Sequence, residues 1–262
     1  MRISILAAVI FLCLGLTTLA RQQQQTQTAM TAPKGTTLLF REDFKAPKPA
    51  PSPGAPGAFV QSQFQLTQDA IANPNLELKL YGPGGKPGTG NQSGLLLSDE
   101  ADPSDPGTIL SIVWSGVTQG PWAVLLRDKN IYLDMRNTAR IRWRIRPRSF
   151  HQLRPMIKLA DGTLLVGDYT EPNSTYFAVM EVYFIDIPRW RIIDPKTMAE
   201  SRLKEGEPLW HADVDLSKVD EIGFTDLMGG AGHGAFGGNV AVDWIEVYGN
   251  PVKRDATQSQ VR

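Results

Sequence analysis

Hydrophobic and polar residues along this chain form short extended segments, and turn-forming residues separate them. Gly-Pro, Asn-Pro and Asp-Gly dipeptides lie between several of the segments. Short strands at such spacing are typical of two-sheet sandwiches. The pattern therefore predicts an all-β fold, a two-sheet antiparallel β-sandwich, with strands at residues 36–40, 59–66, 76–80, 94–97, 108–114, 122–126, 139–146, 156–159, 177–185 and 190–193.

One short helix is expected beside these strands. Asp194 is a suitable cap, Pro195 suits a first helical turn, and Gly206 follows the segment of residues 196–204. The sequence therefore predicts a helix over residues 196–204.

The C-terminal part of the chain has a distinctive order of elements. A short strand at residues 221–224 precedes a glycine-rich loop at residues 229–238, and an alternating strand follows at residues 239–248. This order resembles the closing segment of secreted β-jelly-roll domains of the galactose-binding-like type, a group that contains many carbohydrate-binding modules. The resemblance implies a jelly roll and a polysaccharide or oligosaccharide partner.

Segment composition divides the chain into four parts. Residues 1–20 combine Arg2, an apolar run and small residues at the cleavage positions, which predicts a signal peptide. The alternative is a membrane anchor, but about 14 apolar residues fall short of the roughly 20 that a spanning helix needs. A flexible polar linker (21–35), the β-jelly-roll domain (36–250) and a disordered tail (251–262) follow.

Export has consequences for the mature chain. The single cysteine, Cys13, lies in the predicted signal peptide, so cleavage removes cysteine nucleophiles, thiolate metal sites and disulfides. The predicted location is secreted, periplasmic or at the cell surface, with no membrane span after cleavage. The 27 basic and 27 acidic residues balance, so charge gives no reason to expect nucleic acid as a partner. The oligomeric state stays open.

The segment of residues 140–146 alternates arginine with Ile or Trp, which places four arginines on one face of a strand. One interpretation is a solvated face whose arginines pair with carboxylates on neighbouring strands. The other is a ligand groove on a concave jelly-roll sheet, because a guanidinium group suits hydroxyls or carboxylates and a tyrosine can stack on a sugar ring. The groove residues would be Arg142, Arg144, Glu181 and Tyr183, and the arginines favour an acidic glycan.

The glycine-rich loop offers a second candidate contact. It leads into a strand and lacks the Lys-Ser or Lys-Thr pair of a phosphate-binding loop, which argues against nucleotide binding. His233 lies in the middle of the loop and Asp226 just before it, so both are candidate ligand-binding residues at one rim. The alternative is an inert, solvent-exposed loop.

Jelly rolls of the resembled type often hold a structural calcium where the first and last strands meet. Glu42 and Asp243 occupy the matching positions and carry the oxygen ligands that Ca²⁺ prefers. The alternative is that Glu42 caps a turn and Asp243 pairs with a basic group.

Catalysis is the weaker hypothesis. Glu181 and Asp186 resemble the outer residues of the Glu-x-Asp-x-x-Glu strand of laminarinase-like glucanases, but Tyr183 replaces the central Asp and the last Glu is an Asp. The favoured function is therefore a secreted non-catalytic carbohydrate-binding β-sandwich. A glycoside hydrolase or lyase using Glu181 and Asp186, and an envelope structural or protein-interaction module, are the alternatives. An exposed aromatic platform beside the arginines would favour sugar, and a fully ion-paired face would favour the structural module.

Overall fold

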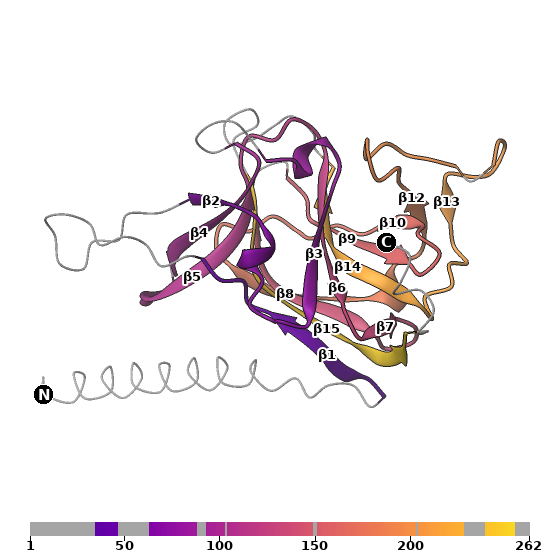
Figure 1. Ribbon diagram of the computed structural model, residues 1–262, viewed down its shortest axis with the longest axis horizontal. Helices are drawn as coiled ribbons and strands as arrows, with labels where there is room; N and C mark the ends of the chain where they lie inside the picture. Colours follow the sequence, from indigo (N-terminus) through magenta and orange to yellow (C-terminus); the bar gives the residue numbers. More distant parts are fainter. Residues whose placement is uncertain are drawn as a thin grey trace, which may run out of the picture. The chain divides into compact units, whose positions relative to one another are not determined.

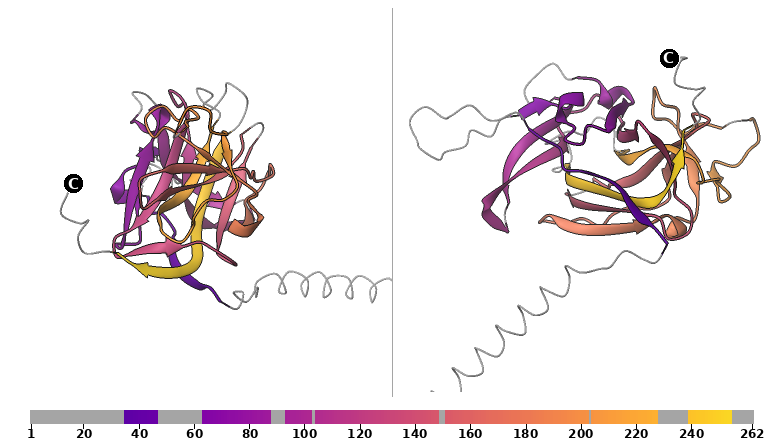
Figure 2. Two further views of the ribbon diagram at one scale, coloured as in Figure 1. Left: turned by 90° about the vertical axis from the view of Figure 1, so that its right-hand side faces the viewer. Right: turned by 60° about the horizontal axis from the view of Figure 1, so that its bottom comes forward.

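Two antiparallel sheets lie face to face in the computed structural model, as Figures 1 and 2 show. The structure describes residues 35–46, 63–87, 93–102, 104–148, 151–202, 204–227 and 239–254. The predicted glycine-rich loop with His233 and the predicted signal peptide lie outside these residues. The predicted two-sheet all-β fold, a β-sandwich of the jelly-roll type, is confirmed.

Sheet A contains the two ends of the domain. The last strand pairs with β8 along one edge and with β1 and β5 along the other, while β11 extends the sheet beyond β8. Figure 1 shows β1 alongside β15 at the bottom of the molecule. The strands are β1 (Thr37–Glu42), β2 (Gln63–Gln65), β4 (Leu95–Asp102), β5 (Asp105–Ser115), β8 (Arg140–Pro147), β11 (Ala178–Tyr183) and the first part of β15 (Val240–Lys253).

Sheet B is built around β14, which pairs with β6 and β7 on one side and with β9 on the other. From β9 the sheet continues through β10 and β12 to a short edge strand, β13. The strands are β3 (Leu76–Tyr81), β6 (Trp122–Asp128), β7 (Ile131–Asp134), β9 (Arg154–Leu159), β10 (Leu164–Gly167), β12 (Trp190–Ile192), β13 (Trp210–His211) and β14 (Val219–Asp226).

The core fills the space between the sheets because each strand turns alternate residues inward. Sheet A contributes Trp143 and Val242, and sheet B contributes Leu126, Ile157 and Phe224, all at most 1% exposed. Burying each such side chain stabilises the fold by about 1.5–3 kcal/mol. One apolar interior shared by both sheets therefore holds the sandwich together.

The last strand joins the two sheets. Residues 240–248 of β15 pair with β8 in sheet A, and residues 250–253 pair with β7 in sheet B. The crossing point is Gly249, where an added Cβ would lie 2.7 Å from the carbonyl oxygen of Asp134. Only glycine fits this corner without a shift of the backbone. The domain was expected to end at residue 250, but the strand continues to Lys253, and Arg254 then binds Asp220 and the carbonyl oxygen of Asp128.

The predicted helix over residues 196–204 is wrong. The Asp194 carboxylate accepts the N–H groups of Lys196 and Thr197, as a helix cap would, but the chain forms only a turn. Met198 has a φ of 60°, which no α-helix accommodates, and its buried side chain packs on the outer face of sheet B. Tertiary packing of Met198 therefore overrides the local helix signals.

The helices in the described residues are three single 3₁₀ turns. They span Gln68–Ala70, Pro83–Gly85 and Phe184–Asp186. No helix in these parts of the chain has the length and apolarity to cross a membrane.

Candidate functional site

The alternating arginine segment forms β8, and its pattern is confirmed. Ile141, Trp143 and Ile145 point into the core and are at most 1% exposed. The arginines lie on the outer face of sheet A, between β15 and β11. We call Arg140, Arg142, Arg144 and Arg146 the arginine ladder.

The half of the ladder nearest β4 is fully ion-paired. Arg146 forms a two-pronged pair with Glu100, with N–O distances of 2.6 and 2.7 Å. Arg144 bridges Asp102 at 2.6 Å and Asp243 at 2.8 Å. Burial lowers the pKa of Arg144, but hydrogen bonds to the two carboxylates outweigh it and raise the pKa above the ordinary value. Burial acts to raise the pKa of Asp102, but hydrogen bonds from Ser104 and Arg144 prevail and lower it to about 2.

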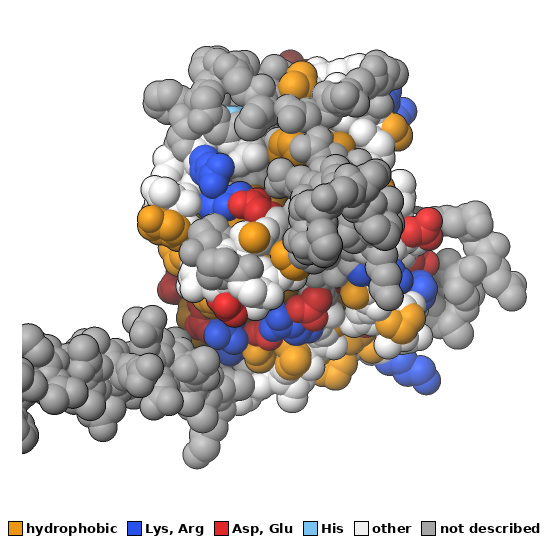
Figure 3. All heavy atoms as spheres, turned by 90° about the vertical axis from the view of Figure 1, so that its left-hand side faces the viewer, with side chains coloured by type: hydrophobic (Ala, Val, Ile, Leu, Met, Phe, Trp, Pro, Cys, Tyr) orange, Lys and Arg blue, Asp and Glu red, His pale blue; other side chains and the backbone are white. Residues whose placement is uncertain are grey.

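The other half of the ladder has partners on both sides. Arg142 lies 3.2 Å from Glu246 on β15 and 3.5 Å from Glu181 on β11. Glu181 also lies 3.6 Å from Arg140, which is almost completely buried. Five carboxylates therefore form ion pairs with the arginine ladder, whereas only Glu181 was predicted from the sequence. Figure 3, facing the side of β4 and β5, shows acidic and basic side chains next to one another.

Aromatic rings cover the same guanidinium groups. Their centroids lie between 3.9 and 5.7 Å from the guanidinium carbons, the range of cation–π contact. The pairs are Tyr183 and Tyr248 with Arg140, Trp244 with Arg142, and Phe177 with Arg144 and Arg146. The rings are thus stacked on protein cations, and they form no bare platform for a sugar.

The predicted groove residues do lie together on sheet A. Arg142 and Arg144 face Glu181 and Val179 across the β8–β11 pair, and Tyr183 donates to the Glu181 carboxylate at 3.2 Å. Burial and the nearby Glu181 raise the pKa of Tyr183. These side chains therefore already satisfy one another, so a ligand on this face would have to displace internal partners.

The two predicted catalytic carboxylates have different surroundings. Glu181 lies on β11 between the arginines, whereas Asp186 is exposed in the 3₁₀ turn that follows the strand. Glu181 therefore already has two arginine partners on the ladder, Arg140 and Arg142.

Glu42 lies at the end of β1 and is completely buried. Its carboxylate accepts three backbone N–H groups, from Phe44 and Ala72 at 2.7 Å and from Asn73 at 3.0 Å. Burial raises the pKa of Glu42 although these hydrogen bonds act to lower it. Glu42 therefore fastens residues 72–73 to the first strand.

Asp243 is the other predicted calcium ligand. Its Oδ2 accepts from Arg144, and burial nevertheless raises its pKa. In the part of the chain that the structure describes, no group of three or more His, Cys, Asp or Glu residues is arranged to hold a metal ion. Both carboxylates thus have protein partners, the alternative that the sequence left open, and calcium stays a prediction.

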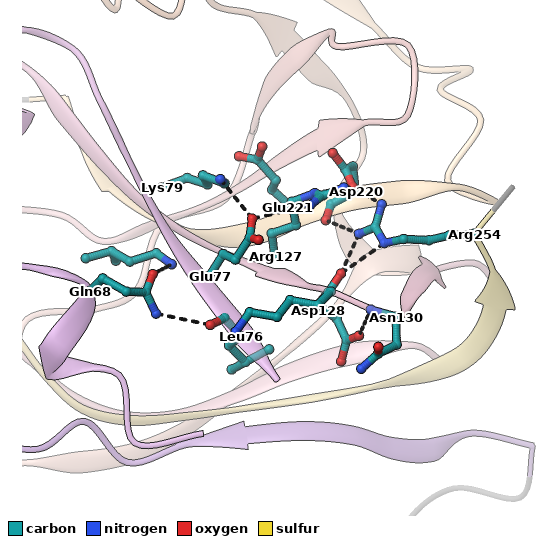
Figure 4. Close-up of polar contacts among 12 residues, drawn as sticks. Gln68, Leu76, Glu77, Lys79, Arg127, Asp128, Asn130, Asp220, Glu221 and Arg254 are labelled. Atoms are coloured by element: carbon teal, nitrogen blue, oxygen red, sulfur yellow. Dashed lines mark hydrogen bonds and ion pairs between the residues drawn. The ribbon is translucent and has the colours of Figure 1, made fainter. Parts of the chain in front are cut away.

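The outer face of sheet B carries a separate polar network near β3. Arg127 lies 3.0 Å from Asp220 and 3.3 Å from Glu77, and Lys79 lies 2.9 Å from Glu77. Figure 4 shows how Arg254 reaches the same Asp220 from the end of β15. This network ties four strands together, so we assign it a structural role.

The opposite end of sheet B has a cavity of about 290 Å³. This volume is close to the lower limit of about 300 Å³ for small-molecule sites. The cavity lies where the ends of β9 and β14 meet β10, β12 and β13. Its lining comprises Gln152, Arg154, Val166, Asp168, Arg191, Trp210, Asp226 and Leu227.

The indole of Trp210 forms an aromatic wall of the cavity. Trp210 lies opposite Arg191 in the β12–β13 pair. The guanidinium carbons of Arg191 and Arg189 lie 3.9 and 4.7 Å from the ring centroid. Arg189 is itself held by the Asp168 carboxylate at 2.7 Å. The position of the indole is therefore set by a cation stack within the protein.

Arg154 differs from the ladder arginines. It pairs with Thr225 across the β9–β14 ladder, and its side chain makes no ion pair or hydrogen bond with another residue that the structure describes. Burial lowers the pKa of Arg154, although the charges of Asp168 and Asp226 act to raise it. Among the described residues, no side chain therefore occupies its hydrogen-bond donors.

Asp226 is the one predicted ligand-binding residue that lies at this cavity. Its carboxylate is 2.5 Å from Nδ1 of His151, and both side chains are at most 2% exposed. His233, which was predicted at the same rim as Asp226, lies outside the described residues. The ligand role of Asp226 therefore stays a prediction.

Four residues of the cavity lining were not predicted from the sequence: Arg154, Asp168, Arg191 and Trp210. Arg154 and Arg191 each alternate with apolar neighbours, a signal that they face away from the core. Nothing local indicates that β9, β12 and β13 become neighbours, because that depends on strand pairing between distant segments.

The two-layer fold and the cavity on an outer sheet face place the chain with β-sandwich domains of the jelly-roll type. No family model and no curated protein matches the chain. It is similar to a solved family 11 carbohydrate-binding module of a cellulosomal cellulase of Clostridium thermocellum, with 14% identity, 82% of this chain and 95% of that chain covered, and a TM-score of 0.36.

Two further structures show the same kind of similarity. One is a Clostridium thermocellum family 11 module in complex with a β-1,3-1,4-mixed-linked tetrasaccharide, with 14% identity, 75% of this chain and all of that chain (100%) covered, and a TM-score of 0.38. The other is an exo-β-agarase, with 10% identity, 70% of this chain and 24% of that chain covered, and a TM-score of 0.36. The fold assignment rests on the strand pairing described above.

Proposed function

We propose that this chain is an exported carbohydrate-binding β-sandwich whose ligand site is the cavity on sheet B. The observation that carries the proposal is the combination, in one cavity, of an indole wall, Trp210, with the guanidinium group of Arg154, which has no ion pair among the described residues. Export is supported by the signal-peptide pattern of residues 1–20.

The lining suits a sugar chemically. Arg189 and Arg191 stack on the Trp210 ring, but the indole also lines the cavity, so the part of it that faces the cavity can contact the C–H face of a pyranose ring. Asp168 and Asp226 can accept from hydroxyl groups, Gln152 can both donate and accept, and Arg154 can donate to two oxygens at once. A second hollow of about 250 Å³ has no aromatic side chain in its lining of Pro147, Arg148, Asn173, Ser174 and Thr175. The sheet B cavity is therefore the better candidate.

A second candidate function has its own support. The arginine ladder is ion-paired along its length and stacked with aromatic rings, which favours a structural or protein-interaction role for sheet A. Such a role is compatible with a sugar site on the other sheet. It becomes the main function if no glycan binds.

Affinity electrophoresis through gels that contain soluble polysaccharides tests the proposal. Trp210→Ala should weaken retention about tenfold, because the stacking surface is lost. Trp244→Ala is a matched control: Trp244 also stacks on two arginines, Arg41 and Arg142, but lies on sheet A. Near-ultraviolet circular dichroism should show that both variants remain folded.

The same gels test the groove predicted on sheet A. Arg142→Ala and Tyr183→Ala should leave retention unchanged if the cavity is the site. Weaker retention in these two variants, with normal retention of Trp210→Ala, would move the site to the ladder face. No retention of the parent protein by any polysaccharide would end the carbohydrate proposal.

Calcium at Glu42 and Asp243 is the remaining part of the proposal. A resident ion that binds the folded state at a hundred times its Kd adds about 2.7 kcal/mol of stability. A chelator should then lower the melting temperature, and added Ca²⁺ should restore it. An identical melt with and without chelator would discard the ion, and the partners seen for both carboxylates would be their whole role.

A further inference from the structure

The two carboxylates that line the cavity on sheet B have partners within the protein, whereas one of its donors, Arg154, has none among the described residues. Asp168 accepts from Arg189 at 2.7 Å, and Asp226 contacts His151 at 2.5 Å, so each carboxylate has a protein partner. Arg154 has none among the described residues. The strongest group left for an incoming molecule is therefore a guanidinium group.

Arg191 adds to this imbalance. It pairs with Glu200 through one terminal nitrogen, while its Nε is buried without a hydrogen-bond partner in the described residues. Burial lowers the pKa of Arg191, and the nearby charge of Arg154 lowers it further. Arg154, which has no ion pair among the described residues, thus lies in the cavity near a second cation, Arg191.

An anion between these arginines would offset both the burial of the two cations and the repulsion between them. A carboxylate matches the planar fork of Arg154 and can accept two parallel N–H groups. A neutral hydroxyl would leave the cost of the partly buried cation in place. The cavity volume of about 290 Å³ limits the group to about one sugar unit.

We propose that the cavity recognises a uronate unit of an acidic saccharide, with Arg154 binding the carboxylate and Trp210 contacting the ring. This inference rests on the proposed carbohydrate-binding function and adds the class of sugar. It differs from the acidic glycan expected at the arginine ladder, because the ladder arginines already have carboxylate partners.

Binding of the mature chain to three uronate polymers, polygalacturonate, alginate and glucuronoxylan, tests this proposal by isothermal titration calorimetry. Methyl-esterified polygalacturonate keeps the backbone and removes the charge. Arg154→Gln should weaken binding to the preferred acidic polymer about tenfold to a hundredfold, the range for hydrogen bonds to a charged group. Methyl esterification should produce a similar loss.

Arg148→Gln is the matched control. Arg148 is also without an ion pair among the described residues, but it lines the other hollow, and the substitution removes the same charge. It should leave the affinity within about twofold, and equal losses in the two variants would show general attraction to a polyanion and overturn the assignment.

The remaining outcomes separate the two proposals. Equal binding of acidic and esterified polymers that depends on Trp210 but not on Arg154 would overturn the uronate assignment and leave carbohydrate binding intact. Binding of a neutral glucan alone would do the same. Binding of no glycan would overturn both.

Discussion

Arg144 on sheet A and Arg154 on sheet B are both strand arginines that face away from the core, yet their surroundings differ. Arg144 bridges two carboxylates, and its pKa rises above the ordinary value. Arg154 has no ion pair within the described residues, and burial lowers its pKa. If the cavity binds a ligand as proposed, an outward arginine on a sheet indicates a site where the neighbouring strands supply no carboxylate partner for it.

Each of the two faces has a tryptophan that stacks on two arginines, but the surroundings of the two stacks differ. Trp244 stacks on Arg41 and Arg142 in a closed ion-pair network, and Trp210 stacks on Arg189 and Arg191 beside a cavity. In sheet A the stack completes a surface. In sheet B the stack holds one wall of the cavity in place.

The largest effect that separates the faces should come from removing each arginine. Arg144→Ala leaves Asp102 and Asp243 without their shared cation while both stay mostly buried, so it should destabilise the fold by about 3 kcal/mol. Arg154→Ala removes no ion pair that the described residues form, and it should change stability by less than about 0.5 kcal/mol. Urea unfolding followed by circular dichroism measures both.

A similar loss of stability in the two variants would contradict the distinction between a closed and an open face. The slope of the free energy of unfolding against urea should stay constant in each case. A change in that slope would mean that the substitution altered the compactness of a state rather than an ion pair.

Much of the ladder face could be predicted from sequence, because strict alternation fixes which side of β8 each residue occupies. Its closure could not, since the partners of Arg144 lie 42 and 99 residues away in the chain. Alternation in residues 239–248 places Glu246 on an outer face, but only the β8–β15 register brings it to Arg142.

The cavity was harder to predict from the sequence, because it too depends on pairing between strands that are distant in the chain. Trp210 lies on a strand of two residues, too short for any periodicity to appear. Its neighbour Arg191 was within a predicted strand, but the pairing of β12 with β13 is a tertiary contact that the local sequence does not determine. The failed helix at residues 196–204 shows the converse, because good local signals lost to the packing of Met198 on sheet B.

A smaller effect should appear in the pH dependence of stability. The pKa of Asp102 is about 2 in the folded protein, below the value of about 3.9 in an unfolded chain. A depressed pKa means that Asp102 adds stability above the unfolded value and that this stability is lost as pH falls toward 2. Asp102→Asn should therefore be less stable than the parent by about 2 kcal/mol at pH 6, and the gap should close by pH 2.

Urea unfolding at pH 6, 4, 3 and 2 measures this gap, with Asp69→Asn as a control on an exposed aspartate. The control should match the parent at every pH. A gap for Asp102→Asn that stays constant with pH would mean that the ion pair with Arg144 adds no net stability, and the ladder would then resemble the cavity in leaving its arginine uncompensated. If the difference in stability between the parent and Asp102→Asn disappears at low pH, the stability of sheet A depends on its ionised carboxylates. Arg154 on sheet B should show no such dependence.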